Sequence, residues 1–239
     1  LPIKPAGVAG IAVRPTKHLT IGASWRQSLD LEINLPTTMV VDDTFSLTLE
    51  TRGTVLYTPD TYNLGMAYLV PSLGTLLTLD ASYIRWSQAP DPSLRMTLNV
   101  SGSAVEGIGL DERLDVADGS PVDLNFRDTW VLRLAAEHTV ASGYIFRAGY
   151  GWRPSPAPIP TGPYNYIDGN AQLLSLGLGI PLRQSGPQGT HKLSIDAAYH
   201  LTLMSRDLVR QRGGDMDPVG DYDAGGQVHA FGLTVRQSL

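Results

Sequence analysis

Apolar and polar residues alternate from Leu19 to Ile33, over a longer stretch than a soluble strand needs. A period of two places successive side chains on opposite faces of a sheet. A soluble strand runs about 5–6 residues, whereas this pattern continues for fifteen residues with one polar residue, Gln27, on the apolar side. Lipid on one face and a wet, charged lumen on the other would produce such a pattern. The pattern therefore predicts a membrane β-strand.

The same alternation recurs at residues 77–83, 130–136, 144–152, 174–182, 193–201 and 231–239. Most of these segments reach the roughly 9–11 residues that a tilted membrane strand requires once their flanks are included. The aromatic residues on the apolar parity fit the girdles found at membrane interfaces. They are Trp25, Tyr83, Trp130, Tyr144, Tyr150, Trp152 and Tyr199.

Short and long connections alternate along the chain, as in bacterial outer-membrane barrels with short periplasmic turns and long external loops. The expected short turns are 14–18, 70–75, 140–143 and 182–190, and the expected long loops are 36–43, 89–121, 154–168 and 207–225. These connections separate nine expected strands: 6–14, 18–35, 44–70, 75–88, 120–140, 143–153, 169–182, 190–206 and 225–239.

Two features of this strand list need explanation. Segment 44–70 is too long for one regular strand, and Pro59 is expected to break it because proline cannot donate to a ladder. The count of nine is odd, whereas single-chain bacterial barrels have even strand numbers and cannot expose a sheet edge to lipid. Either one strand is miscounted, or the chain lacks strands at its N-terminal side.

Composition narrows the class of protein further. The chain has no cysteine, which removes disulfide frameworks and thiolate metal sites, and its net charge of −5 disfavours a nucleic-acid surface. The uncharged run 61–79 contains Pro71 and Gly74, so it predicts strand, turn and strand rather than a membrane helix. No signal peptide precedes Leu1, so we expect the chain to begin after processing or inside a longer protein.

Four segments, in order, resemble the FadL/TodX family of outer-membrane transporters for long-chain fatty acids and aromatic hydrocarbons. The segments are GVAGIAVRPTKHLTIGASWRQ (7–27), TYNLGMAYLVPSLGTLLTLDASYIRWSQ (61–88), FRDTWVLRLAAEH (126–138) and FRAGYGWRPSPAPIP (146–160). The last is the most similar, with an Arg-x-Gly strand, Arg147 and Gly149, running into a Ser-Pro-x-Pro loop, Ser155 to Pro158.

The resemblance implies an all-β fold, an antiparallel transmembrane β-barrel of the outer-membrane type in Gram-negative cells. Family members have fourteen strands and an N-terminal plug, and the best registration makes this chain the last nine strands. Residues 1–239 would then form a single barrel domain without its first strands and plug. The kinked third strand, through which family members are thought to release ligand sideways, would be absent.

Charged side chains share the parity opposite to the apolar face, and they form the candidate ligand-binding or lumen-lining set. The set is Arg26, Asp30, Glu32, Asp80, Arg133, Glu137, Arg147, Arg153, Asp196, His200 and Arg236. One interpretation is a lumen whose cations meet a fatty-acid carboxylate, with Arg147 and Arg153 as the preferred contacts. The favoured interpretation is a neutralising ladder that supports the wall, because buried charges must be paired and both signs are mixed evenly.

Enzymatic and metal chemistry find little support in the sequence. Ser194, Asp196 and His200 share a face, but positions four apart in a strand are about 13 Å apart, too far for a hydrolytic triad. The acidic residues of the last long loop do not have the spacing of an EF-hand; they are Asp215, Asp217, Asp221 and Asp223. We therefore expect no enzyme, no cofactor and no metal site.

The leading functional hypothesis is passive outer-membrane transport of hydrophobic small molecules, captured by external loops. Apolar loop residues would provide the surface for capture: Ile108, Leu110, Leu114, Ile159, Tyr164, Tyr166 and Ile167. The alternative is a non-transporting structural or adhesive barrel in an envelope assembly. A soluble β-sandwich binding module is a third possibility, but it leaves the long apolar row unexplained. Expected partners are a hydrophobic ligand, outer-membrane lipid, lipopolysaccharide and other envelope proteins, but no nucleic acid.

Overall fold

A computed structural model describes residues 4–42, 45–101, 113–118, 123–159, 167–185, 191–209 and 221–238. The chain divides into two compact units, each with one antiparallel sheet. The larger unit contains residues 8–26, 61–86 and 126–239, and the smaller contains residues 1–7, 27–60 and 87–125. Among the described residues, no helix is long and apolar enough to cross a membrane.

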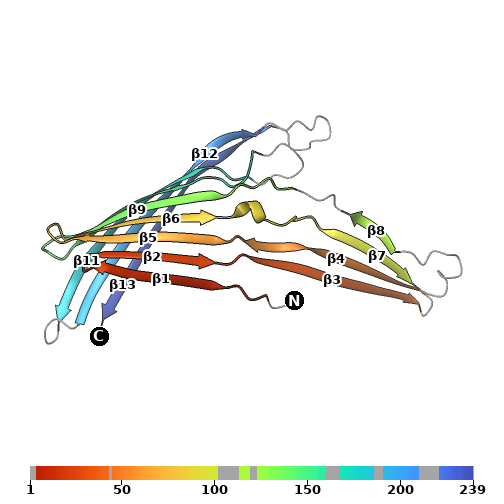
Figure 1. Cartoon of the computed structure of the whole chain (residues 1–239), viewed down its shortest axis with the longest axis horizontal. Helices are drawn as coiled ribbons and strands as arrows, with labels where there is room; N and C mark the ends of the chain where they lie inside the picture. Colours follow the sequence, from red (N-terminus) through yellow and green to blue (C-terminus); the bar gives the residue numbers. More distant parts are fainter. Residues whose placement is uncertain are drawn as a thin grey trace. The chain divides into compact units, whose positions relative to one another are not determined.

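The larger unit contains a nine-stranded sheet in which every neighbouring pair of strands is antiparallel (Figure 1). The spatial order is β1-β2-β5-β6-β9-β10-β11-β12-β13. The bounds are β1 Val8–Thr16, β2 Leu19–Arg26, β5 Thr61–Val70, β6 Thr75–Ile84, β9 Thr129–Thr139, β10 Ile145–Arg153, β11 Ala171–Ser185, β12 His191–Val209 and β13 Tyr222–Ser238. The all-β antiparallel class is confirmed. Each of the nine expected segments contributes one strand to this sheet, but segments 18–35 and 44–70 each contain a second strand that belongs to another sheet.

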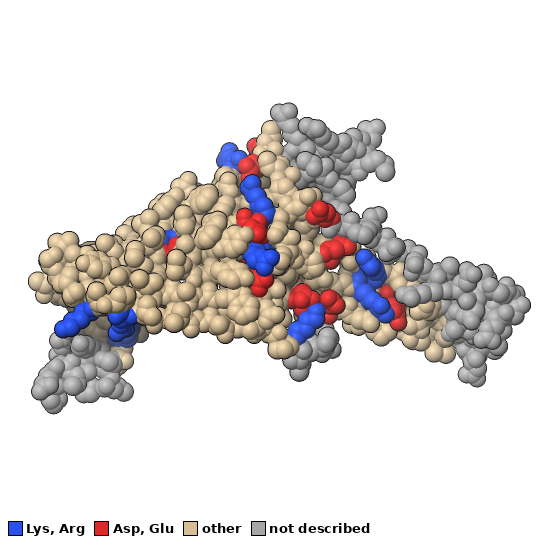
Figure 2. All heavy atoms as spheres, in the orientation of Figure 1, with Lys and Arg blue, Asp and Glu red and all other residues tan. Residues whose placement is uncertain are grey.

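One face of this sheet is apolar across all of its strands. The register aligns Leu64 with Ala81, and Ala81 with Leu132, so the apolar parity continues from strand to strand. Large side chains on this face remain exposed, for example Leu176 at 61% and Trp130 at 54%. Few charged side chains interrupt the surface over these strands in Figure 2. A face of this kind requires an apolar solvent, so the predicted lipid-facing alternation is confirmed.

An aromatic row crosses four adjacent strands at one end of the apolar face. The register places Trp25 beside Tyr62, Tyr62 beside Tyr83, and Tyr83 beside Trp130. The rings of Tyr62 and Tyr83 have centroids 6.4 Å apart, and those of Tyr83 and Trp130 are 4.9 Å apart. Tyr83 also donates a 2.6 Å hydrogen bond to Asp128. The row has the composition of an interfacial girdle, with apolar rings and polar tips.

The described part of the sheet is open, because β1 and β13 are its two edge strands. Each is paired with one neighbour only, β1 with β2 and β13 with β12. An unpaired edge cannot face hydrocarbon, since no water is available to satisfy its backbone groups. The expectation that this chain does not close a barrel by itself is therefore confirmed for the described strands.

The smaller unit contains a four-stranded sheet in the order β3-β4-β7-β8. Its strands are β3 Leu29–Asp42, β4 Phe45–Thr58, β7 Arg95–Ser101 and β8 Arg113–Asp118. The chain enters it from β2 and β6 and leaves it to β5 and β9, so these four strands belong to the long connections of the nine-stranded sheet. Long connections are the external ones in outer-membrane barrels.

The expected single strand 18–35 is wrong, because the chain changes sheet between β2 and β3. The Gln27 N–H donates to the Gly7 carbonyl at 2.9 Å, and the Ser28 N–H donates to Asp60 Oδ1 at 2.9 Å. These two hydrogen bonds take the place of strand-to-strand hydrogen bonds at Gln27 and Ser28, the two residues between β2 and β3. Because the break contains two residues, the alternation continues through it with unchanged parity. The expected break in segment 44–70 at Pro59 is confirmed, since β4 ends at Thr58.

Two expected loops contain regular strands instead. Segment 36–43 is mostly β3, which continues to Asp42, and segment 89–121 contains β7 and β8. Pro36 is tolerated inside β3 because β3 is an edge strand, where a missing N–H breaks no second ladder. Trp86 begins a short 3₁₀ turn, Trp86–Gln88, and its ring meets Phe126 edge-on at 6.1 Å.

Neighbouring positions on β9 provide a test of the two faces. We expect Leu134→Arg to block assembly of the full-length protein, because a charge at the bilayer midplane costs about 2–4 kcal/mol. Ala135→Arg should assemble, since residue 135 has the opposite parity and faces Gly149 in the register. Heat-modified mobility and outer-membrane yield measure assembly. Equal assembly of both variants would contradict the assignment of the faces.

Candidate functional site

The face opposite to the apolar one, here called the charged face, contains a hollow of about 480 Å³. Strands β9, β10, β11 and β12 supply most of its lining. Four candidates from the sequence border it: Arg133, Glu137, Arg147 and His200. Small residues such as Gly149, Gly151 and Gly177 form its floor, which leaves space above the strands.

Arg147 is held by two carboxylates from different strands. Its Nε donates to Glu137 Oε2 at 2.6 Å, and its Nη1 donates to Asp196 Oδ1 at 2.8 Å. The three side chains are partly exposed, at 35%, 38% and 20% for Arg147, Glu137 and Asp196. Charge-assisted bonds of this length are the stronger class of hydrogen bond. The network connects β9, β10 and β12 and has a formal net charge of −1.

Two glycines of β11 let the Arg147 side chain reach Asp196. A Cβ at Gly177 would lie 3.2 Å from the Cβ of Arg147, and one at Gly179 would lie 3.1 Å from Asp196 Oδ1. Both distances are tighter than ordinary contacts, so larger residues would displace the network. The glycines on the polar parity of β11 are therefore explained by the side chain that crosses above them.

His200 forms a separate polar group on the charged face. Its Nδ1 lies 2.8 Å from Ser175 Oγ, and its Nε2 lies 3.2 Å from Thr202 Oγ1. Ser194 instead lies opposite Arg236 in the register of β12 and β13. Ser194, Asp196 and His200 thus do not form a relay of the hydrolytic kind.

The other candidates on this sheet lie apart from the Arg147 network. Asp80 and Arg133 are register partners on β6 and β9, and the Asp80 carboxylate lies over Gly65, with Oδ1 2.6 Å from where a Cβ would stand. Arg26 is exposed at the end of β2, and Arg236 is exposed near the end of β13. These positions line the charged face without converging on one point.

Arg153 is the last residue of β10, and it pairs with Asp168 at the other end of the connection to β11. Its two terminal nitrogens donate to the two Asp168 oxygens at 2.8 Å each, a bidentate pair. Nearby, the N–H of the buried Ser155 donates a hydrogen bond to Asn170 Oδ1 at 2.9 Å. Arg127 adds a bond from Nε to the Ser155 carbonyl at 3.2 Å. Sequence reasoning missed these partners, although the Ser-Pro-x-Pro segment marked the place.

The four-stranded sheet has one apolar and one polar face over its described side chains. Leu35, Leu49 and Leu98 belong to one parity. Ile33, Met39, Leu47 and Met96 share it, and Leu94 lies over Gly53, with Cδ2 2.5 Å from where a Cβ would stand. Exposure remains high on this face, 56% for Leu35 and 62% for Met39. In most antiparallel sheets, such an apolar face packs against the hydrophobic core.

The polar face of the four-stranded sheet is charged and hydroxylated. The Arg52 guanidinium bonds Glu50 at 2.8 Å, and the Thr38 and Thr48 hydroxyls lie 3.1 Å apart. Glu32 and Asn34 also belong to this parity, as do Arg95, Thr97 and Asn99. A polar face of this kind can remain in water, whereas the apolar face is left for an apolar partner.

Asp30 and Glu32 belong to this sheet and not to the nine-stranded one, so their expected place on the lumen surface is wrong. The break at Gln27 and Ser28 moves them into β3. The Lys4 ammonium bonds Asp30 at 2.5 Å and Glu32 at 3.4 Å. The hydrogen bond from Lys4 is the largest cause that holds the pKa of Asp30 below its usual range.

Some expected contact residues can be placed and others cannot. Ile159 and Ile167 are exposed, at 56% and 55%. Ile108, Leu110, Tyr164, Tyr166, Asp215 and Asp217 lie outside the described residues, and so does the side chain of Leu114. Within the described ranges, no group of three or more His, Asp or Glu side chains could hold a metal ion.

The open antiparallel sheet, its apolar face and its charged face define a transmembrane sheet of the outer-membrane barrel class. Residues 6–238 match the family described as outer membrane protein transport protein (OMPP1/FadL/TodX), and the chain belongs to this family. It is therefore an outer-membrane protein of the Gram-negative type, and the resemblance found in the sequence is confirmed. That residues 1–239 form a single barrel domain stays a prediction.

Two solved structures are similar to this chain. The crystal structure of a Pseudomonas aeruginosa FadL homologue is 18% identical, with a TM-score of 0.57, and the match covers 97% of this chain and 50% of that one. The CymD monoaromatic hydrocarbon channel is 17% identical, with a TM-score of 0.45, over 82% of this chain and 46% of that one. The chain thus spans about half the length of each. No curated protein matches it.

Removing the Arg147 side chain tests whether it supports the wall. We expect Arg147→Ala in the full-length protein to lower the free energy of unfolding by about 1–2 kcal/mol, because two partly exposed carboxylates lose their partner. Arg147→Gln combined with Glu137→Gln and Asp196→Asn should recover most of this loss. Denaturant titration in bilayers, followed by tryptophan fluorescence, measures both. Unchanged stability of Arg147→Ala would show that the guanidinium does not support the wall.

Proposed function

We propose that this chain forms part of a passive outer-membrane channel that takes up hydrophobic small molecules captured on the external side. Lipopolysaccharide slows apolar solutes at the cell surface, so a barrel for them needs an apolar surface outside the membrane. The apolar face of the four-stranded sheet is the observation that carries the proposal. In this proposal the protein does no catalysis, and its ligand is the hydrophobic molecule itself.

The Arg147 network favours uncharged ligands over fatty-acid anions. A fatty-acid carboxylate would meet a guanidinium whose positive charge is already balanced by Glu137 and Asp196, since both already bond it. The network also has one negative charge in excess, which repels a third carboxylate. We therefore propose neutral hydrocarbons, aromatic ones included, as the preferred ligands, and long-chain fatty acids as weaker ones.

A non-transporting structural or adhesive barrel remains the alternative. The same apolar face would then contact another envelope protein, and the charged face would only brace the wall. Transport differs from adhesion in one measurable respect, because only transport makes uptake depend on the apolar face while the protein stays correctly assembled.

Adjacent residues of β7 separate the two faces of the four-stranded sheet. We expect Leu98→Glu in the full-length protein to reduce whole-cell uptake of radiolabelled toluene about fivefold, from roughly 1 kcal/mol of lost apolar contact. Asn99→Glu adds the same charge on the polar face and should leave uptake unchanged. Surface levels are matched by antibody labelling. If the two variants behave alike, the apolar face does not capture the ligand.

A matched pair of ligands tests the preference for uncharged molecules. Hexadecanol and palmitate have chains of equal length, and only palmitate carries a charge at pH 7. We expect faster uptake of hexadecanol into vesicles that contain the full-length protein. The contrary result is faster uptake of palmitate that Arg147→Gln abolishes in a correctly assembled protein. It would show that Arg147 binds the carboxylate.

A further inference from the structure

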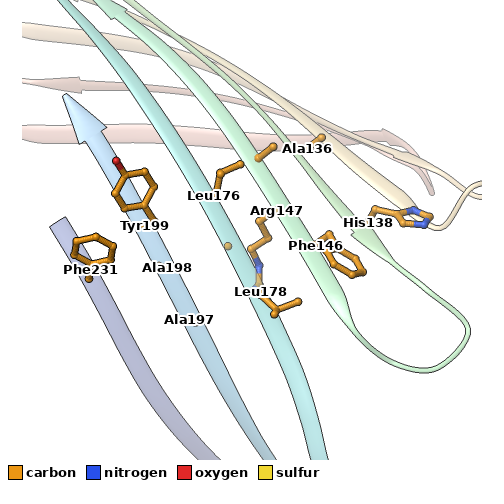
Figure 3. Close-up of a pocket in the computed structure, with 12 residues that line it drawn as sticks. Ala136, His138, Phe146, Arg147, Leu176, Leu178, Ala197, Ala198, Tyr199 and Phe231 are labelled. Carbon is orange, nitrogen blue, oxygen red and sulfur yellow. The ribbon is translucent and has the colours of Figure 1, made fainter. Parts of the chain in front are cut away.

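The apolar face carries a groove on β10, β11 and β12 that the transport proposal does not use. A hollow of about 650 Å³ lies between large side chains, and Ala136 and Ala197 are among the residues that line it (Figure 3). Ala148 lines it as well. Phe146, Leu178 and Tyr199, from three adjacent strands, border it. Its volume lies in the range of small-molecule sites, about 300–1,000 Å³.

A second hollow continues the first along the strands. It has a volume of about 420 Å³ and shares Ala136, Ala148 and Tyr199 with the first, then extends to Leu134, Tyr150 and Leu201. From the level of Phe146 to that of Tyr150 the groove runs four residues along β10, about 13 Å. One leaflet of the hydrocarbon core is about 15 Å thick. The groove therefore has the length of an acyl chain in a single leaflet.

One end of the groove is polar and lies beside the short turns. His138 lines the hollow and is exposed, one residue before the end of β9. Its Nδ1 lies 2.9 Å from Thr75 Oγ1, and among the described residues its Nε2 has no hydrogen-bond partner. Short turns are periplasmic in this class of barrel. Nε2 thus lies where the headgroups of the periplasmic leaflet begin.

We propose that this groove is a binding site for a phospholipid of the periplasmic leaflet, with one acyl chain over Ala136, Ala148 and Ala197 and the phosphate at His138. The groove lies on the apolar face of the sheet, which faces the membrane. Lipid hydrocarbon is therefore the solvent of the groove. An imidazole N–H at Nε2 can donate a hydrogen bond to a phosphate oxygen. The apolar side chains of the groove hold the lipid against the outside of the wall, and Arg147, whose neighbours Phe146 and Ala148 have the apolar parity, also lines the hollow.

Filling the groove tests the proposal in the full-length protein. The test variant is Ala148→Leu with Ala197→Leu, and the control is Ala23→Leu with Ala81→Leu, which adds the same groups to the apolar parity of β2 and β6. The proteins are extracted from vesicles of phosphatidylethanolamine and phosphatidylglycerol, and native mass spectrometry measures retained phospholipid. We expect about tenfold lower retention in the test variant, because the added leucine side chains occupy the space of the acyl chain. The control should retain phospholipid like the unmodified protein.

Further outcomes decide between occupants of the groove. Equal retention in the test and control variants would overturn the proposal. Retention of lipopolysaccharide in place of phospholipid, when both are supplied, would overturn it as well. Reduced toluene uptake with unchanged phospholipid retention in the test variant would assign the groove to the transported ligand. His138→Leu should reduce phospholipid retention with the groove intact, and unchanged retention in that variant would overturn the place of the headgroup.

Discussion

Hydrocarbon cannot hydrogen-bond a peptide group, and this constraint shapes the whole nine-stranded sheet. Every strand inside lipid must pair on both sides, and neighbouring strands of this sheet are antiparallel, with local register shifts only in the β1–β2, β11–β12 and β12–β13 pairs. Between these shifts the register transmits parity from one strand to the next, which separates an apolar face from a charged face. The charged face can then collect Glu137, Arg147 and Asp196 from three strands, although 59 positions separate the first from the last.

The sequence predicts the membrane sheet well, because parity is a local property. Each alternating segment reports its own two faces, and the seven such segments fall on seven of the nine strands of the sheet. The same property hides the change of sheet after Arg26. A break of two residues preserves parity, so the alternation from Leu19 to Ile33 looks continuous although β2 and β3 belong to different sheets.

Other features depend on register and could not be read from single segments. The sequence places Arg147 and Asp196 on one parity, but only the pairing of β10, β11 and β12 shows that they meet across Gly177 and Gly179. The strands β7 and β8 were expected to be a loop, because their pairing depends on β4, far away in the sequence. The local alternation of residues shows which side chains share a face of a strand. The partners of those side chains depend on how strands that are distant in the sequence align.

Two of the four joints between the sheets, those after Arg26 and before Thr61, have a consequence for how such proteins can change. Arg26 and Thr61 are direct partners in the nine-stranded ladder, and the hairpin of β3 and β4 leaves and returns between them. The Ser28 N–H donates to Asp60, so the two joints are tied to each other. The hairpin thus leaves and rejoins the membrane ladder at neighbouring positions, while β4 pairs with β7 in its own sheet. A replacement for the hairpin therefore has to preserve the pairing with β7, whereas the ladder between β2 and β5 places no demand on its length.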